Sequence, residues 1–322
     1  ANTLKALVKT PPRHLFSTLH KHNERLGHPK LTQLFDRFAT YNGSDPYRAP
    51  AMLSLIPHLE HGIGAVFPVG GMHAITEGYM KLAKELGVEF RFNTPVKRLE
   101  VKDKQVTSIH TAAGTVDADV IVSNIDIYPT FKHLLPDQPQ PERALKQERS
   151  SSAMIYYWGM DKRYDLSLHN IFFSDDYRRE FEQIFQDKSL PDDPTIYVHV
   201  STAFVPEDAP NGHSTWFILV NAPADTGQDW DALRPQLRQT GITKLERMLG
   251  KQVGEHIVAE DYLDPPRIQL RTGSYQGALY GSSSNTKTAA FFRQPNFSRN
   301  IRNLYFVGGS VHPGGGIPLC LS

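Results

Sequence analysis

Cysteine is almost absent from this sequence, and so are long apolar runs and an excess of either charge. Cys320 is the single cysteine, which excludes a disulfide framework within the chain and favours a reducing compartment. No stretch approaches the roughly 18 apolar residues that a membrane-spanning helix needs. Lys and Arg total 35 against 34 Asp and Glu, so the net charge of the chain is close to zero and does not indicate nucleic acid as a partner. We expect a cytoplasmic protein, and peripheral contact with the inner face of a membrane stays open because it requires only an amphipathic surface.

The pattern along the chain changes three times, and a length of 322 residues suits about two domains. Residues 1–64 are predicted to be mostly helical, with Leu31, Leu34, Phe35 and Phe38 on one apolar face. Residues 65–128 have an α/β pattern. It comprises a helix with apolar positions from 75 to 86 and strands at 88–92, 96–102, 105–110 and 120–122, the last of them buried.

A second domain is predicted over residues 129–298. Its strands are expected at 153–159, 195–201, 215–221 and 256–262, and its main helix ends at Gly250 with a start that Pro235 leaves open. Residues 299–322 have the same α/β pattern as residues 65–128, because the apolar run 303–307 predicts another buried strand. The α/β domain is therefore expected to be formed by two separate stretches of the chain, with a second domain inserted between them.

The segment after that last strand is the most informative part of the sequence. Five glycines fall within residues 308–316. Glycine frees the backbone and removes side chains, so main-chain amides can approach a flat or anionic ligand closely. An ordinary tight strand-to-helix turn would also use glycine, for steric reasons alone.

Residues 303–318 (Asn-Leu-Tyr-Phe-Val-Gly-Gly-Ser-Val-His-Pro-Gly-Gly-Gly-Ile-Pro) closely resemble the C-terminal flavin signature of bacterial phytoene and related carotenoid desaturases. Residues 67–96 resemble the second FAD-facing stretch of that family, and residues 120–124 resemble the strand that follows it. The resemblance implies an α/β plus α+β protein: a partial Rossmann-like FAD-binding domain (65–128 and 299–322) and an inserted mixed-sheet and helical substrate domain (1–64 and 129–298). It also implies FAD as cofactor, a long apolar polyene such as phytoene as substrate, and desaturation by hydride transfer to the flavin.

The same resemblance implies which residues face the cofactor. Two glycines would lie near the pyrophosphate or flavin, a valine backbone would contact the adenine, and the tail would follow the ribityl chain and the isoalloxazine ring. The implied cofactor-binding residues are Gly70, Gly71, Val96, Asn124, Gly309, Ser310, Gly316, Ile317 and Pro318. No catalytic residue, metal ligand or oligomeric state is assigned.

Two departures from the family pattern bear on cofactor binding. The family opens with a strand, a G-x-G-x-x-G turn and a helix, whereas Gly62-Ile63-Gly64 lacks the third glycine and a preceding strand. The family also continues beyond the position of Ser322. We therefore expect a piece of a longer chain that binds FAD weakly and is inactive alone, and we expect a restored N-terminal βαβ unit to restore FAD binding.

Several alternatives stay open at this point. A carotenoid isomerase, a hydroxycarotenoid desaturase and a polyene-binding piece without redox activity would share these motifs. Ser310 stands in a sequence close to a hydrolase nucleophile elbow, but His312 replaces its last glycine. His58, Glu60 and His61 match no zinc motif and predict a solvated helix face. Aromatic side chains could ease positive charge on a polyene or simply fill a core: Tyr156, Tyr157, Trp158, Phe172 and Phe173.

Overall fold

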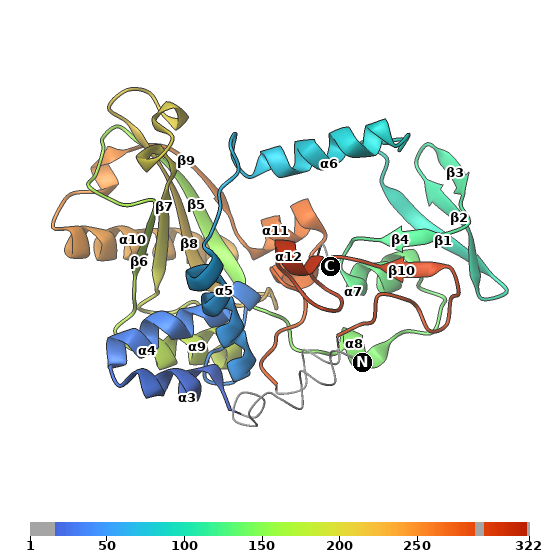
Figure 1. Cartoon of the computed structure of the whole chain (residues 1–322), viewed down its shortest axis with the longest axis horizontal. Coiled ribbons are helices and arrows are strands. Elements are labelled where there is room, and N and C mark those ends of the chain that lie inside the picture. The colour runs from blue at the N-terminus through green and yellow to red at the C-terminus, as the bar shows by residue number, and fades with distance from the viewer. Residues whose placement is uncertain (1–16, 287–292, 321–322) are drawn as a thin grey trace.

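A five-stranded antiparallel sheet forms one lobe of the molecule (Figure 1). The structure is a computed structural model that describes residues 17–286 and 293–320. The strands lie in the order β6-β7-β8-β5-β9. Their bounds are β5 (Ser152–Met160), β6 (His169–Phe172), β7 (Ile196–Val200), β8 (Ser214–Ala222) and β9 (Ile257–Leu263). The four strands predicted in this part of the chain are confirmed, and β6 is an addition.

Period-two alternation gives this sheet two different faces. On one face Met154, Trp158 and Trp216 are buried against α10 (Trp230–Leu249). The predicted helix is confirmed: it starts at the Asp229 cap, runs through Pro235 and ends at Gly250, whose φ is 62°. The opposite face points toward the rest of the molecule and carries the side chains discussed below.

The other lobe is built around two short parallel strands that lie far apart in the sequence. β4 (Ile121–Ser123) pairs with β10 (Leu304–Phe306). Leu304 and Phe306 are buried against Ile121 and the helical turn η4 (Thr130–Leu134), so the tail strand is confirmed, but Tyr305 is 42% exposed and only one face of the strand is buried. A three-stranded antiparallel sheet lies beside them, formed by β1 (Val96–Lys102), β2 (Gln105–Thr111) and β3 (Gly114–Asp117).

The strands predicted at 96–102 and 105–110 are confirmed, and they pair as a hairpin. β1 and β2 meet at Asp103 and Lys104, whose φ angles of 51° and 60° are those of a type I′ turn. The prediction of a strand at 88–92 is wrong, because within the described residues no strand lies alongside to complete the hydrogen bonds.

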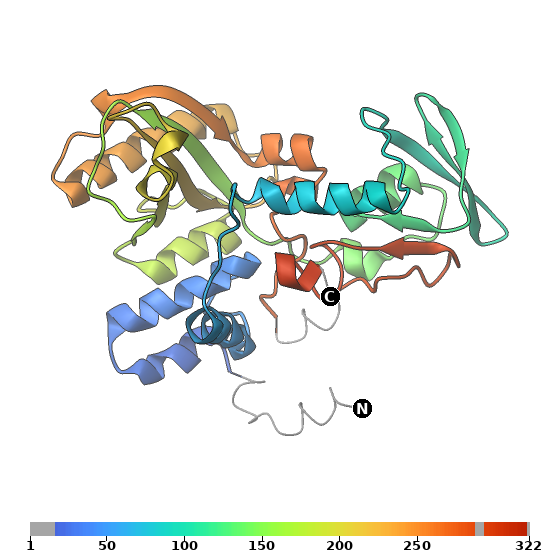
Figure 2. The same cartoon turned by 45° about the horizontal axis from the view of Figure 1, so that its top comes forward.

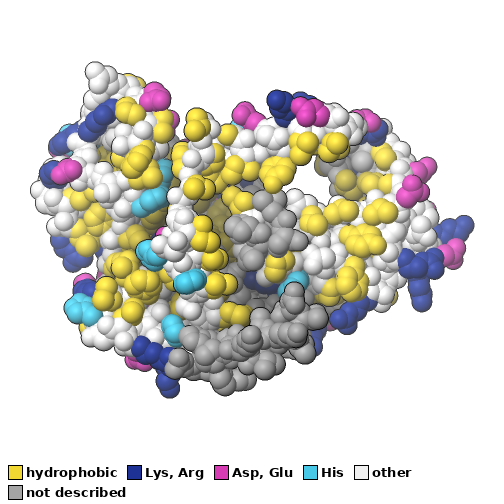
Figure 3. Space-filling model, in the orientation of Figure 1, with side chains coloured by type: hydrophobic (Ala, Val, Ile, Leu, Met, Phe, Trp, Pro, Cys, Tyr) yellow, Lys and Arg dark blue, Asp and Glu magenta, His cyan; other side chains and the backbone are white. Residues whose placement is uncertain are grey.

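The expectation that residues 120–122 are wholly buried is also wrong. Val120 and Val122 are more than half exposed, since only one face of the β4–β10 pair is covered. Helix α6 (His73–Glu85) forms where a helix was expected and ends before Gly87, but none of its residues is buried. Figure 2 shows α6 crossing from one lobe to the other, and Figure 3 shows an opening beneath it.

Short helices make up the remaining part of the first lobe. They include α3 (Leu19–Asn23), η1 (Glu24–Leu26), α4 (Pro29–Asp36), η2 (Arg37–Asn42), η3 (Ala51–Ser54) and α5 (Leu55–Ile63). The helix expected at Leu31 and Leu34 forms as α4, but both leucines are partly exposed and α4 buries Thr32 and Asp36 instead. Asp36 can be buried because its carboxylate has hydrogen-bonding partners: it accepts a hydrogen bond from the Asn23 amide at 2.8 Å and contacts the His20 ring nitrogen at 2.6 Å.

The remaining helical turns connect these parts. Their bounds are α7 (Ile127–Pro129), α8 (Glu142–Leu145), α9 (Tyr177–Glu182), η5 (Gln183–Asp187), η6 (Ser201–Ala203), η7 (Pro206–Asp208), η8 (Gly254–His256), α11 (Pro265–Thr272), η9 (Tyr275–Gly277) and α12 (Ile317–Cys320). Across residues 17–286 and 293–320, no helix combines the length and the apolar character that crossing a membrane requires.

Candidate functional site

The glycine-rich segment between β10 and α12 is folded tightly against neighbouring backbone. Gly308 has a φ of +96°, and a Cβ atom there would stand 2.5 Å from Asn124 Oδ1, so only glycine fits without a shift. A Cβ on Gly315 would stand 2.6 Å from the Tyr280 ring. The loop therefore touches the end of β4 on one side and, on the other, residues 279–281, which lie beside the start of β5.

Gly316 is different, because its surroundings are open. Its φ is +121°, and no atom lies within 4 Å of a Cβ placed there. Gly71 likewise has a positive φ of 86° and nothing within 4 Å. Glycine at these two positions leaves one side of the backbone clear of other atoms.

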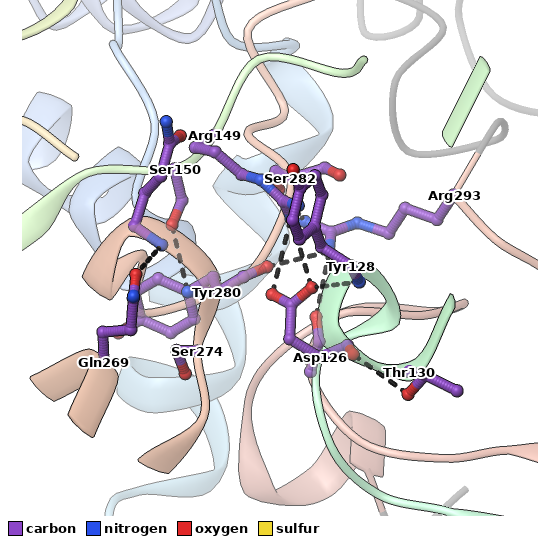
Figure 4. A network of polar contacts seen from close by, with 12 residues as sticks. Asp126, Tyr128, Thr130, Arg149, Ser150, Gln269, Ser274, Tyr280, Ser282 and Arg293 are labelled. Carbon is purple, nitrogen blue, oxygen red and sulfur yellow. Dashed lines mark hydrogen bonds and ion pairs between the residues drawn. The ribbon is translucent and has the colours of Figure 1, made fainter. Parts of the chain in front are cut away.

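Arg293 holds the glycine-rich loop in place (Figure 4). Its side chain is buried, and Nη1 donates to the carbonyl oxygens of Tyr280 and Gly309, each at 3.0 Å. Nη2 donates to the carbonyl oxygen of Ser282 at 2.7 Å. Burial lowers the pKa of Arg293 to about 10. The guanidinium thus ties two distant segments together through main-chain acceptors.

A buried ion pair lies beside this clamp in the same view. Arg149 Nη1 is 3.4 Å from Asp126 Oδ2, and both side chains are almost wholly buried. The Arg149 guanidinium also lies 4.8 Å from the centroid of the Tyr275 ring, which stacks on Tyr128. A hydrogen bond with Tyr128, together with burial, raises the pKa of Tyr275. Sequence reasoning missed Arg293 and Arg149, because neither stands in a motif and their partners come from distant segments.

The sequence-predicted site residues divide into two groups. Asn124 lies against Gly308, and Ser310 lies against Gly281, whose Cβ position is 2.7 Å from Ser310 Cα. Gly309 is held by the Arg293 clamp.

The other residues have different surroundings. Gly70 and Gly71 precede α6, Val96 begins β1 opposite Thr111, and Ile317 and Pro318 begin α12. A Cβ on Gly70 would meet only Ala74, at 3.8 Å, so the contacts of this turn do not join it to the tail loop.

The face of the five-stranded sheet opposite α10 is rich in aromatic rings, and we call it the aromatic face. It is defined by residues that are neighbours across the strands: Ile155, Tyr157, Tyr197, His199, Phe217 and Leu219. The ring centroids of Tyr157 and Phe217 are 5.6 Å apart, and those of Tyr197 and Phe217 are 6.3 Å apart. Figure 3 shows hydrophobic and histidine side chains along a groove between this lobe and the segment that leads from α5 to α6.

Two of the five aromatic residues singled out in the sequence differ sharply in their surroundings. Trp158 belongs to the core beneath α10, together with Tyr156 and Phe172. Tyr157 points the other way and lies on the aromatic face, with 39% of its surface exposed. The strand alternation of β5 therefore selects Tyr157 as a residue that a bound ligand can reach.

β5, which carries part of the aromatic face, begins next to the glycine-rich loop. Tyr280, which packs on Gly315, has its amide bonded to Ser150 Oγ at 3.0 Å, just before β5 starts. Burial raises the pKa of Tyr280, and burial raises the pKa of Tyr197 to about 12. Both phenols are therefore protonated at neutral pH and can donate hydrogen bonds but cannot act as bases.

Comparison with known proteins identifies the class of protein that has this fold and site. The family model described as flavin containing amine oxidoreductase matches residues 14–322. An oxidoreductase from Methanosarcina mazei superimposes with a TM-score of 0.62 at 13% identity, covering 88% of this chain and 61% of that one. A putrescine oxidase triple mutant gives 0.58 at 12% identity, covering 93% and 64%. The chain belongs to the flavin-containing amine oxidoreductase family.

Within that family the similar sequences are carotenoid enzymes. The chain is 50% identical over 320 residues to 1-hydroxycarotenoid 3,4-desaturase of Flavobacterium sp. (strain P99-3), covering 99% of this chain and 66% of that protein. It is 36% identical over 300 residues to 4,4'-diapolycopene oxygenase of Methylomonas sp., covering 90% and 60%. The chain thus spans 60–66% of the length of these two relatives. The expected resemblance to carotenoid desaturases is confirmed.

Proposed function

We propose that this chain belongs to an FAD-dependent desaturase that introduces a double bond into an acyclic hydroxycarotenoid. The observation that carries the proposal is the aromatic face, which starts at the glycine-rich loop and leads away from it along β5. The 50% identity to a 1-hydroxycarotenoid 3,4-desaturase favours a hydroxylated polyene over phytoene.

In this proposal the chain supplies binding, orientation and exclusion of water. FAD, when bound, supplies the redox chemistry by accepting a hydride from an allylic carbon. Gly71 and Gly316 would leave room for the cofactor, and Arg293 would keep the tail loop pressed against Tyr280. The rings of Tyr157 and Phe217 would hold the polyene by its flat faces. The same proposal includes the partial Rossmann-like fold and the domain boundaries given above. It also assigns further residues to FAD binding: Gly70, Val96, Asn124, Gly309, Ser310, Ile317 and Pro318.

A second candidate function is oxygenation of a polyene end, because a relative at 36% identity is named an oxygenase. One experiment separates the candidates. The chain joined to an N-terminal βαβ dinucleotide-binding unit is incubated with FAD and an acyclic hydroxycarotenoid, and the polyene is then analysed by mass and absorption. Desaturation removes two hydrogen atoms and shifts absorption to longer wavelength, whereas oxygenation adds oxygen.

The remaining alternatives give other outcomes in the same assay. Isomerisation changes the spectrum without changing the mass. A polyene that binds without any change in mass or spectrum would leave only a binding role. Either result would overturn the proposed desaturation.

We also propose peripheral contact with a membrane, through which an apolar polyene would enter. Leu55, Leu59 and Ile63 recur every four residues along α5, and all three are exposed. Such a stripe can insert into the interfacial region of a lipid bilayer. Cosedimentation with lipid vesicles is expected for the wild-type chain and should fall for Leu59→Asp. Equal sedimentation of both proteins would contradict this assignment.

A further inference from the structure

A cavity of about 490 Å³ lies at the end of the aromatic face that is remote from the glycine-rich loop. It is lined by Tyr157, Gly159, His199, Ser201, Thr215 and Phe217, among others. Gly159 follows Ser152 by seven residues on β5, so at about 3.3 Å per residue the cavity lies about 23 Å along the strand from the loop end. The cavity is thus far from the cofactor end of the face.

The side chains of the aromatic face change character along this direction. Nearer the loop, Ile155 and Leu219 are opposite one another, and the row is mainly aliphatic. The next row places Tyr157 beside Phe217, and Phe217 beside His199. In the row after that, farther from the loop, the side chains are small or hydroxylated: Gly159, Ala259, Thr215 and Ser201. An apolar surface therefore ends in a polar one.

The polar end has a defined arrangement. Ser201 Oγ and Thr215 Oγ1 are 2.8 Å apart and form a hydrogen-bonded hydroxyl pair. Gly159 pairs with both Thr215 and Ala259, so two short residues create the hollow beside that pair. His199 borders the same hollow, and its ring lies 5.3 Å from that of His169. Burial lowers the pKa of His199, and the nearby His169 lowers it further to a smaller extent. The His199 imidazole is therefore neutral at neutral pH and can donate or accept a hydrogen bond.

From this arrangement we infer that the cavity is a subsite for a hydroxyl group on the polyene end remote from the flavin. A hydroxyl group there can donate to one member of the Ser201–Thr215 pair and accept from the other or from His199, whereas a hydrocarbon end would cover these polar groups and offer them no further hydrogen bond. The inference rests on the proposed function, because it assigns one end of the proposed substrate. It adds specificity for polyenes that carry a polar group at both ends.

The test compares two acyclic carotenoids with equal conjugation, one with a hydroxyl group at each end and one with none. Binding to the 322-residue chain is measured by quenching of tryptophan fluorescence, since Trp158 and Trp216 lie on the strands behind the aromatic face. The double variant Ser201→Ala, Thr215→Val removes both hydroxyl groups at nearly constant volume. Thr243→Val, at an exposed position on α10, is the matched control.

The double variant should weaken binding of the dihydroxylated polyene about tenfold, the loss expected for one good hydrogen bond, and leave the hydrocarbon within about twofold. The control should bind both polyenes as the wild type does. Equal changes for the two polyenes, or no change, would overturn the subsite and leave the proposed function standing. Failure of the wild type to bind either polyene would contradict the proposed function itself.

Discussion

Replacement of Arg293 tests whether the clamp stabilises the glycine-rich loop. In Arg293→Met the side chain keeps much of its apolar bulk but loses three hydrogen bonds to the carbonyl oxygens of Tyr280, Ser282 and Gly309. Hydrogen bonds to a charged group contribute about 1.5–3 kcal/mol each. Burial of the charged guanidinium offsets part of this stabilisation. Lowering the pKa of Arg293 from 12.5 to about 10 corresponds to a free-energy cost of about 3 kcal/mol for keeping the group charged. We expect a net loss of about 3 kcal/mol in the free energy of unfolding.

The assay is equilibrium denaturation in urea, monitored by tryptophan fluorescence. Arg299→Met is the matched control, because Arg299 is an exposed arginine only six residues away, and its loss should change the free energy of unfolding by less than about 0.5 kcal/mol. Arg293→Lys should fall between the wild type and Arg293→Met, since an ammonium group cannot reach three acceptors in a fork geometry. If Arg293→Met unfolds at the same urea concentration as the wild type, the clamp contributes nothing and the reasoning is refuted.

Three further predictions concern single residues. Burial raises the pKa of Asp45 from 3.8 to about 6, so the stability it contributes is full below pH 3.8 and is lost as pH rises through 6. Asp45→Asn should therefore reduce the loss of stability between pH 4 and pH 7 by about 2.5 kcal/mol in urea denaturation, and an unchanged pH profile would contradict the shift. Gly308→Ala should destabilise by more than about 2 kcal/mol through its positive φ and the contact with Asn124, and Asn124→Ala should recover part of that loss in a double-mutant cycle. Asp126→Asn leaves Arg149 buried without its counter-ion and should cost about 3–5 kcal/mol; a melting temperature equal to that of the wild type would count against the pair.

Local patterns predicted most of the regular structure. Alternation along β5 and β8 marked two strands correctly, because both strands have one face buried against α10. The turn at Asp103 and Lys104 lies where the sequence left a break between two predicted strands, and its type I′ geometry came from the structure. The same reasoning failed at residues 88–92, since alternation there does not supply the neighbouring strand that a sheet requires.

The site was only partly predictable. The glycine pattern pointed to the tail loop, because a positive φ and close backbone contacts select glycine locally. Arg293 could not be found in this way, since its acceptors come from segments that meet only in the folded molecule. Tyr157 was singled out in the sequence as one of several aromatic residues, but its place on the aromatic face depends on which side of β5 α10 covers.

The central claim is that a polyene on the aromatic face gives up hydrogen to a flavin at the glycine-rich loop. An anaerobic single-turnover experiment tests it most directly: the flavin-loaded protein is mixed with an acyclic hydroxycarotenoid, and both chromophores are followed by stopped-flow absorption. We predict that flavin bleaching and the shift of polyene absorption to longer wavelength occur with the same rate constant. A polyene that shifts while the flavin stays oxidised, or a flavin that never bleaches although the polyene is bound, would contradict the account.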